Sequence, residues 1–145
     1  SRLRRTPSAA GSPVSFQQFA RKIPLMTSHK QTLGRWGEET AVRHLQRQGY
    51  TILARNLRTR HGELDIVAQK DEALFFVEVK MRSSNAFGFP EEAVTPRKQA
   101  HMLMAAEAYF EQHPDCPETW QFDIIAITRR TGSPPEIEHF ENVIG

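Results

Sequence analysis

The sequence predicts an α/β fold in which a mixed sheet is flanked by helices, and three observations favour it. Two segments, residues 31–48 and 96–112, carry apolar residues at helical spacing. Three strand-like segments rich in β-branched and aromatic residues lie between them, and further strand-like sequence follows the second helix. This order of elements forms layers around one core, and 145 residues suffice for one such domain.

The first predicted helix spans residues 31–48, and Gly49 is well placed to end it. Its apolar residues at helical spacing are Leu33, Trp36, Ala41 and Leu45. Glu38 and Glu39 fall in the early turns of this helix, where negative charge is favourable to the helix dipole. A purely structural role is therefore one explanation for both carboxylates.

The second predicted helix begins at Thr95-Pro96, with threonine as N-cap and proline at the first helical position, and runs to about Gln112. Its predicted buried stripe consists of Ala100, Leu103, Met104 and Ala108. Arg97 and Lys98 lie in the first turn, where positive charge is unfavourable to the helix dipole. We therefore expect these two side chains to contact a group outside the helix, such as a phosphate.

Strands are expected at residues 50–57, 62–68, 74–82, 120–128 and 137–140. The second and third form a hairpin that turns at Asp71 and Glu72, so residues whose numbers sum to 143 are paired. Asp65 is then directly opposite Glu78. A loop over residues 83–93, which contains Gly88 and Pro90, is expected to follow the hairpin and to close over a substrate.

The predicted register separates charged from apolar residues. One face is apolar and pairs Leu64 with Val79, Ile66 with Val77, and Ala68 with Phe75. The other face pairs Asp65 with Glu78 and Glu63 with Lys80. Opposed β-carbons lie about 5 Å apart, and alternate residues of a strand about 7 Å apart. Asp65, Glu78 and Lys80 are therefore expected to converge on one small volume.

Carboxylates held this close repel one another unless a proton, a lysine or a cation lies between them. Mg²⁺ is bound by one or two protein carboxylates while phosphate oxygens and waters complete its octahedron. Such a metal offsets charge on a phosphodiester and lowers the pKa of a bound water, and Lys80 would orient that water or stabilise the developing charge. The alternative is a surface hairpin with ordinary cross-strand ion pairs.

Asp65 followed by Glu78-Val79-Lys80 resembles the active-site signature of the PD-(D/E)XK nuclease superfamily. Leu64 stands where that signature has proline, which removes no ligand. A narrower resemblance, to the bacterial YraN family, extends from about Leu33 to Ile127. The segments that carry it are Gly34-Arg35-Trp36-Gly37-Glu38, Arg55-Asn56, Gly62-Glu63-Leu64-Asp65 and Phe76-Val77-Glu78-Val79-Lys80-Met81-Arg82.

This resemblance implies a restriction-endonuclease-like α/β/α sandwich, similar to the archaeal Holliday junction resolvases, and an endonuclease-like activity. It implies that Asp65 and Glu78 are catalytic metal ligands and that Lys80 is the catalytic lysine. It also points to Glu38 as an additional metal-site carboxylate. The expected cofactor is Mg²⁺, with Mn²⁺ as an alternative. Gln121 stands where the family usually has arginine, which puts a basic contact there in doubt.

The expected partner is nucleic acid, with DNA favoured over RNA. The residues expected to contact phosphates are Arg58, Arg60, Arg82, Arg97 and Lys98. A polar turn explains Arg58, Arg60 and His61 equally well. Two other functions stay open: a nucleic-acid-binding module that keeps the nuclease fold without cleavage, and a nuclease acting on RNA. Symmetric cleavage of a four-way junction would require a two-fold dimer.

The net charge of +2 conceals an uneven distribution. Residues 1–30 hold six of the 19 basic residues and no acidic one, which leaves 13 basic against 17 acidic residues in the remainder. Six arginines lie in residues 31–60, whereas eight acidic residues lie in residues 107–145. A one-sided basic surface that meets phosphates and an ordinary solvated surface both account for this asymmetry.

Residues 1–30 lack apolar periodicity and are expected to form a disordered arm. A nucleic-acid-binding arm, a targeting segment and a dispensable extension before a natural start at Met26 are the alternatives, and we favour the extension. The single Cys116 excludes an intrachain disulfide, and the histidines at 29, 44, 101, 113 and 139 show no ligand spacing. With no run of about 20 apolar residues, a cytoplasmic protein is expected.

Overall fold

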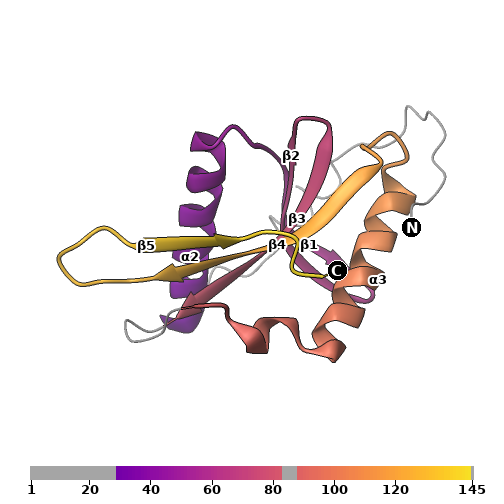
Figure 1. Ribbon diagram of the computed structural model, residues 1–145. Helices are drawn as coiled ribbons and strands as arrows, with labels where there is room; N and C mark the ends of the chain where they lie inside the picture. The colour runs from indigo at the N-terminus through magenta and orange to yellow at the C-terminus, as the bar shows by residue number, and fades with distance from the viewer. Residues whose placement is uncertain (1–28, 83–87, 145) are drawn as a thin grey trace.

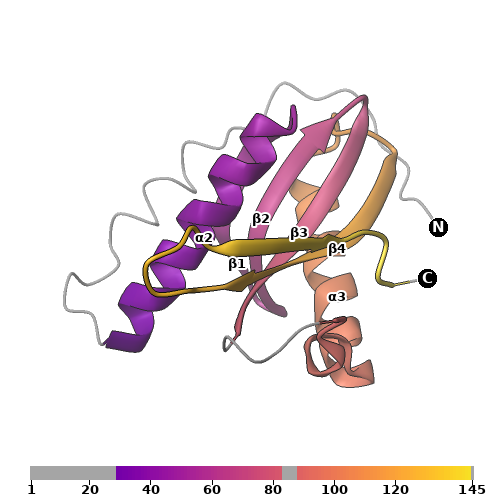
Figure 2. The ribbon, with the colours of Figure 1, turned by 60° about the vertical axis from the view of Figure 1, so that its left-hand side comes forward.

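Two helices lie on opposite faces of one sheet, as the two views of the ribbon show (Figures 1 and 2). The computed structural model describes residues 29–82 and 88–144, with side chains from Gly34 onward. The elements are α2 (His29–Arg47), β1 (Thr51–Thr59), β2 (Gly62–Lys70), β3 (Ala73–Arg82), the short 3-10 helix η1 (Glu91–Val94), α3 (Pro96–Gln112), β4 (Thr119–Thr128) and β5 (Glu136–Phe140). The predicted α/β sandwich is therefore confirmed, and it is consistent with a restriction-endonuclease-like fold.

The sheet is mixed, and its five strands lie in chain order from β1 to β5. β3 and β4 are parallel, whereas the other neighbouring pairs are antiparallel. Parallel neighbours need a long crossover, which η1 and α3 supply by passing over one face of the sheet. This crossover places the first turn of α3 near the end of β3.

The β2–β3 hairpin turns at Asp71 and Glu72, as predicted, with φ angles of 51° and 63°. Left-handed conformations at both central residues belong to the turn type whose twist matches that of a two-residue hairpin. The predicted register holds where Ile66 pairs with Val77, and it continues through the four following pairs to the turn. The same face alternation that the sequence predicts is thus present in this half of the hairpin.

Gly49 ends α2, as predicted, in the left-handed conformation with φ of 96°. Its N–H donates to the carbonyl oxygen of Gln46 at 3.0 Å, and the N–H of Tyr50 donates to that of Leu45 at 2.9 Å. These two bonds satisfy carbonyl groups that the helix end would otherwise leave open. The chain then turns directly into β1.

The bounds of α3 agree with the prediction, and the Thr95 hydroxyl accepts a hydrogen bond from the N–H of Lys98 at 3.2 Å. The predicted buried stripe of α3 is wrong. Leu103 and Met104 are each 41% exposed, and Ala100 is exposed as well. The residues that α3 buries are Met102, Ala105, Ala106, Tyr109 and Phe110. The helix is therefore rotated relative to the expected orientation.

Each face of the sheet has its own apolar core. The cluster under α3 includes Val67, Phe76 and Phe122, and the Phe76 ring meets the Tyr109 and Phe110 rings edge to face. The cluster under α2 contains Ala41, Val42, Leu45, Ile66, Ala68, Phe75, Val77, Ile125 and Ile127. Two cores hold the helices at fixed positions, so both can contribute side chains to one site at the sheet.

Some expectations fall on residues that the structure does not describe. Residues 1–28 of the predicted arm lie outside the described residues, and α2 begins directly after them. Residues 83–87 of the predicted loop also lie outside the described residues. Within the described chain, no helix combines the length and the apolar character needed to cross a membrane.

Candidate active site

The two strands of the hairpin part at Asp65, and this separation creates the site. Backbone pairing of β2 with β3 begins only at Ile66 and Val77. Before that point β2 pairs with β1 alone, where Glu63 lies opposite Arg58. The expected pairs of Asp65 with Glu78, Leu64 with Val79 and Glu63 with Lys80 are therefore absent from the β2–β3 ladder. The structure corrects this part of the predicted register.

The side chain of Asp65 takes the place of a backbone partner at this fork. Its Oδ2 atom accepts a hydrogen bond from the N–H of Val79 at 2.9 Å. An unpaired N–H at a strand fork would otherwise lose its hydrogen bond, which is costly where water has little access. Asp65 thus compensates for the lost ladder bond and is fixed in orientation by β3.

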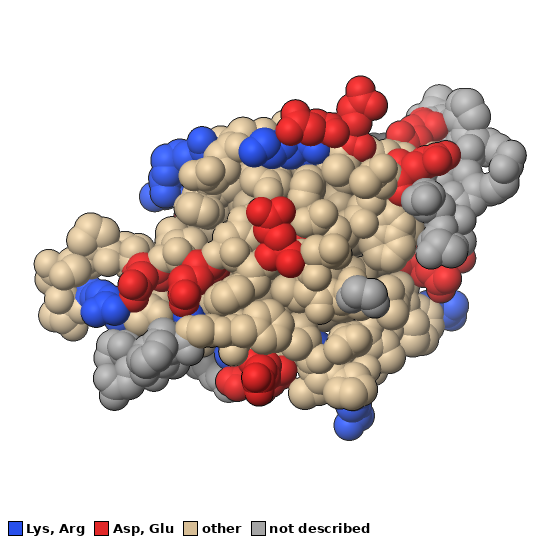
Figure 3. All heavy atoms as spheres, viewed as in Figure 1, with Lys and Arg blue, Asp and Glu red and all other residues tan. Residues whose placement is uncertain are grey.

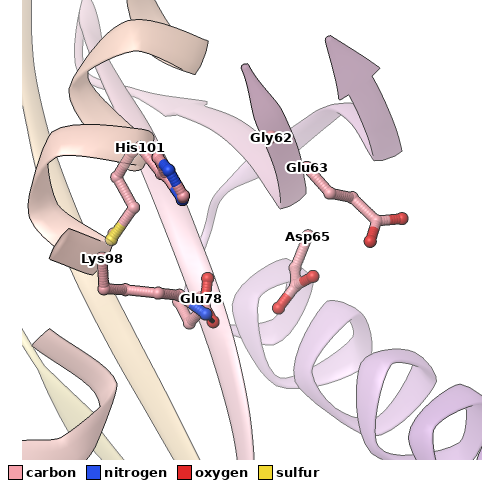
Figure 4. Close-up of a pocket in the computed structure, with 7 residues that line it drawn as sticks. Gly62, Glu63, Asp65, Glu78, Lys98 and His101 are labelled. Carbon is pink, nitrogen blue, oxygen red and sulfur yellow. Dashed lines mark ion pairs between the residues drawn. The ribbon is translucent and has the colours of Figure 1, made fainter. Parts of the chain in front are cut away.

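A pocket of about 290 Å³ opens between the parted strands and α3 (Figure 4). Its lining consists of Gly62, Glu63, Asp65, Glu78, Lys98, His101 and Met102. Asp65 and Glu78 point into the same space from neighbouring strands, and Lys98 reaches Glu78 from α3. The convergence of Asp65 with Glu78 was expected, although the strand geometry that produces it was not.

The environment of Asp65 opposes its ionisation. Burial is the main cause that raises the pKa of Asp65, to about 7, and the carboxylate of Glu78 is the second cause. The hydrogen bond from Val79 lowers this pKa, while the charges of Glu38 and Glu63 raise it further. A nearby cation would reverse these effects, because it stabilises the ionised carboxylate.

Glu78 has a cationic partner in the pocket. The Nζ atom of Lys98 lies 2.8 Å from Oε2 of Glu78, and the side chains of Lys98 and Glu78 are 43% and 16% exposed. The hydrogen bond to Glu78 is the main cause that raises the pKa of Lys98, and burial opposes it. Lys98 therefore remains an ammonium group at the edge of a mainly acidic pocket.

Glu38 lies beside the pocket without lining it. Its Oε1 atom accepts hydrogen bonds from Asn56 Nδ2 at 2.8 Å and from Arg55 Nη2 at 3.5 Å. Burial is the main cause that raises the pKa of Glu38, although the two donors lower it. The first turn of α2 contains no acidic residue, so the helix-dipole explanation for Glu38 and Glu39 does not apply.

The backbone conformation of Asn56 accompanies its hydrogen bond to Glu38. Asn56 adopts a left-handed backbone conformation with φ of 52°. Asparagine tolerates this conformation better than most residues. Glu38, which is only 6% exposed as a residue, is thereby held in place by the Asn56 amide.

The other predicted site residues are not brought into the pocket. Lys80 pairs with Ala126 of β4 and is absent from the described lining. The side chain of Arg82 is largely buried, forms an ion pair with Glu138 and donates a hydrogen bond to the carbonyl oxygen of Gly88. Its Nε atom has no hydrogen-bond partner among the described residues. The roles inferred for both residues stay predictions.

The remaining basic residues lie at the rim or on the surface. Arg58 is 3.7 Å from Glu63 in a loose ion pair between exposed side chains, and Arg60 and Arg97 are exposed. On the face that Figure 3 shows, described Lys and Arg side chains lie in separate groups with acidic side chains beside them. This face therefore carries no continuous basic patch, and the phosphate contacts stay predictions.

No role is expected for His101 or His139 from the sequence. His101 lies three residues after Lys98 on the same side of α3 and lines the same pocket. This helical spacing from Lys98 is the sequence signal that could have indicated His101.

His139 Nε2 lies 2.8 Å from Oδ2 of Asp123, which is fully buried. Gln121 Nε2 and the N–H of Asn142 both donate to Oδ1 of Asp123 at 2.9 Å. Asp123 is thus an integral part of the β4–β5 packing.

The donor set of the pocket is suited to a hard divalent cation. Asp65 and Glu78 supply carboxylate oxygens, and burial together with the neighbouring Glu78 carboxylate raises the pKa of Asp65, two effects that a bound cation would offset. Among the described residues, no three or more His, Cys, Asp or Glu side chains are grouped as a complete metal cage. Mg²⁺ does not need such a cage, since it retains waters and substrate oxygens in its octahedron.

Comparison with known proteins adds the family to this geometry. The model of the "Uncharacterised protein family UPF0102" matches residues 37–127, a segment that contains all the pocket-lining side chains. The chain belongs to the UPF0102 family. This confirms the resemblance to the YraN family that the sequence motifs indicated.

Curated UPF0102 proteins match over nearly their whole length. A "UPF0102 protein" of Syntrophomonas wolfei is 47% identical over 110 residues, which cover 76% of this chain and 95% of the relative. One of Syntrophotalea carbinolica is 48% identical over 115 residues, which cover 79% and 93%. One of Trichlorobacter lovleyi is 45% identical over 121 residues, which cover 83% and 95%. The UPF0102 name assigns no activity, so the function must be argued from the site.

Proposed function

We propose that this UPF0102 protein is a magnesium-dependent endonuclease-like protein that hydrolyses phosphodiester bonds in DNA, with structured or branched DNA as its substrate. The observation that carries the proposal is the convergence of Asp65 and Glu78 in one pocket at a strand fork. The environment of Asp65 supports it, because burial and the neighbouring Glu78 carboxylate both raise the pKa of Asp65, and a bound cation would offset both effects. Mn²⁺ is the alternative cofactor.

Each residue has a defined part in this proposal. Asp65 and Glu78 bind the metal, and Glu38 assists from α2 through its charge. The metal supplies charge neutralisation on the scissile phosphate and a water of lowered pKa. Lys80, placed by strand alternation on the same face of β3 as Glu78, orients that water or stabilises the developing negative charge.

The reaction is a hydrolysis and requires only water as co-reactant. The water oxygen forms a bond to phosphorus, the bond from phosphorus to the leaving sugar oxygen breaks, and that oxygen takes up a proton. Phosphate contacts are assigned to Arg58, Arg60, Arg82, Arg97 and Lys98. The substrate is proposed to meet the pocket on the side where the first turn of α3 approaches β3.

A second function is favoured by one observation. Lys98 already neutralises Glu78, and Lys80 does not line the pocket. Both features suit a nucleic-acid-binding module that keeps the nuclease fold without cleavage. Such a module has no need to bind a metal through Asp65 and Glu78, so metal titration separates the two functions.

A substrate panel tests the proposal. Labelled duplex, single-stranded, flap and four-way-junction DNA, with RNA counterparts, are incubated with the purified full chain in Mg²⁺, in Mn²⁺ and in chelator. We expect cleavage of DNA that needs the metal. Cleavage of RNA alone would make the protein an RNA-directed nuclease, and binding without cleavage in either metal would favour the binding module.

The setting proposed for this activity is the cytoplasm, since the chain has a single cysteine and depends on no disulfide. Symmetric cleavage of a four-way junction would further require a homodimer. Sizing the protein alone and with a junction tests that requirement directly.

A further inference from the structure

The pocket is lined by more acidic than basic side chains. Its lining contains the carboxylates of Glu63, Asp65 and Glu78 against a single ammonium group, that of Lys98. The ammonium lies directly on Glu78, at 2.8 Å from Oε2. A metal ligated by Glu78 would compete with Lys98 for the lone pairs of the same carboxylate.

Lys98 combines a fixed backbone with a long, partly exposed side chain. Its backbone is fixed, because its N–H donates to the Thr95 hydroxyl at the start of α3. Its side chain is 43% exposed and ends on a flexible four-carbon stem, so the ammonium can swing while the backbone stays in place. Asp65 also lines the pocket and is not paired with Lys98, so its ionised carboxylate still attracts a second cation beside the Lys98–Glu78 pair.

We propose that Lys98 is an exchangeable counter-ion: it holds Glu78 in the metal-free protein, yields that carboxylate when a divalent cation binds, and then contacts a phosphate of the nucleic acid. This inference rests on the proposed function of the same pocket. It gives Lys98 two partners at different stages, whereas a purely structural ion pair would have one.

The exchange predicts effects of opposite sign when the ammonium is removed. In Lys98→Met, Glu78 is free for metal, so Mn²⁺ binds about twofold to fivefold more tightly, as expected for the loss of a competing, partly exposed ion pair. The same substitution removes one phosphate contact, so DNA affinity falls about fivefold to tenfold at ~0.1 M salt. Lys98→Arg keeps the positive charge, so its Mn²⁺ affinity and its DNA affinity are expected to stay near those of wild type.

A matched control separates this exchange from a general change of charge. Lys70 lies at the other end of β2 from the pocket, with its Nζ 4.9 Å from the centre of the Tyr50 ring. Lys70→Met removes the same charge and should leave Mn²⁺ affinity unchanged. Circular dichroism melts of all variants confirm that each is folded before it is titrated.

The experiment is calorimetric titration of Mn²⁺ into the full-length wild type, Lys98→Met, Lys98→Arg and Lys70→Met, followed by fluorescence anisotropy with labelled DNA. Ca²⁺ replaces Mn²⁺ in the second step, with DNA integrity checked on a gel. Tighter Mn²⁺ binding with weaker DNA binding in Lys98→Met alone is the expected result. Wild type that binds Mn²⁺, with Lys98→Met no tighter, overturns the exchange and leaves the metal site standing. If neither protein binds Mn²⁺, the proposed function itself is overturned.

Discussion

The carboxylate of Asp65 accepts a 2.9 Å hydrogen bond from the backbone N–H of Val79, at the point where β2 and β3 part. One side chain therefore replaces a missing ladder bond and also lines the acidic pocket. Structure and chemistry depend on the same residue, so substitutions must separate the hydrogen bond from the charge.

The first prediction concerns Asp65 and pH. Because the pKa of Asp65 is raised to about 7 in the folded protein, the folded state binds more protons than the unfolded state between about pH 4 and pH 7. The contribution of this group to stability is present below that window and is lost as the pH rises through it.

Asp65→Asn keeps an acceptor for Val79 and removes the charge. We expect this variant to exceed wild type in free energy of unfolding at pH 8, by on the order of 2 kcal/mol, and to approach wild type at pH 4. Urea unfolding at both pH values measures the difference. Equal free energies of unfolding at pH 8 would show that the ionised carboxylate of Asp65 does not destabilise the folded protein.

The second prediction concerns the metal. Mg²⁺ or Mn²⁺ should raise the melting temperature of wild type more at pH 8 than at pH 5, because the metal requires ionised Asp65. Each tenfold excess over the dissociation constant adds about 1.4 kcal/mol of stability. The shift should vanish in Asp65→Asn and persist in Glu107→Gln, a control that removes an exposed carboxylate of α3. A shift that survives in Asp65→Asn places the metal elsewhere.

The third prediction concerns Asn56 and Glu38. Asn56→Gly tolerates the left-handed backbone and deletes the amide that donates to Glu38, so it should cost about 1 kcal/mol of stability. Asn56→Asp places a second carboxylate against Glu38 and should cost more, with the larger loss at the higher pH, where both carboxylates are ionised. Chemical unfolding at pH 5 and pH 8 compares the stabilities of the two variants.

The hypothesis that Glu38 assists the metal fails if Asn56→Gly and Glu38→Gln both retain wild-type Mn²⁺ affinity.

The fourth prediction separates structural from functional acids. Asp123 is fully buried and accepts two hydrogen bonds besides its contact with His139. Asp123→Ala leaves these partners unsatisfied and should cost about 3–5 kcal/mol of stability. Any fraction that remains folded should bind Mn²⁺ as wild type does. Thermal melts and titration of the folded protein test both statements.

Periodicity in the sequence was sufficient to predict most of the fold. Alternating residues in β2 and β3 located the hairpin, its turn and its register from Ile66 to the turn. The strand fork could not be predicted, because it arises from a side chain that replaces a backbone partner and from α3 packing beside it. Counting residues along two strands assumes that both stay paired.

The orientation of α3 shows a second limit of prediction from sequence. Thr95 and Pro96 located its start, but apolar residues occur on more than one side of the helix. The aromatic ring of Phe76 in β3 selects the side that carries Tyr109 and Phe110, a choice that depends on the neighbouring sheet. The same rotation brings Lys98 and His101 to the pocket, which explains why His101 was missed.

The most direct test of the central claim is the rate at which purified wild type, Asp65→Asn, Glu78→Gln and Glu107→Gln cleave the preferred DNA of the panel in Mg²⁺. We expect metal-dependent cleavage by wild type and Glu107→Gln, and its loss in the two pocket variants while both remain folded. Cleavage by Asp65→Asn and Glu78→Gln at the wild-type rate would contradict that claim.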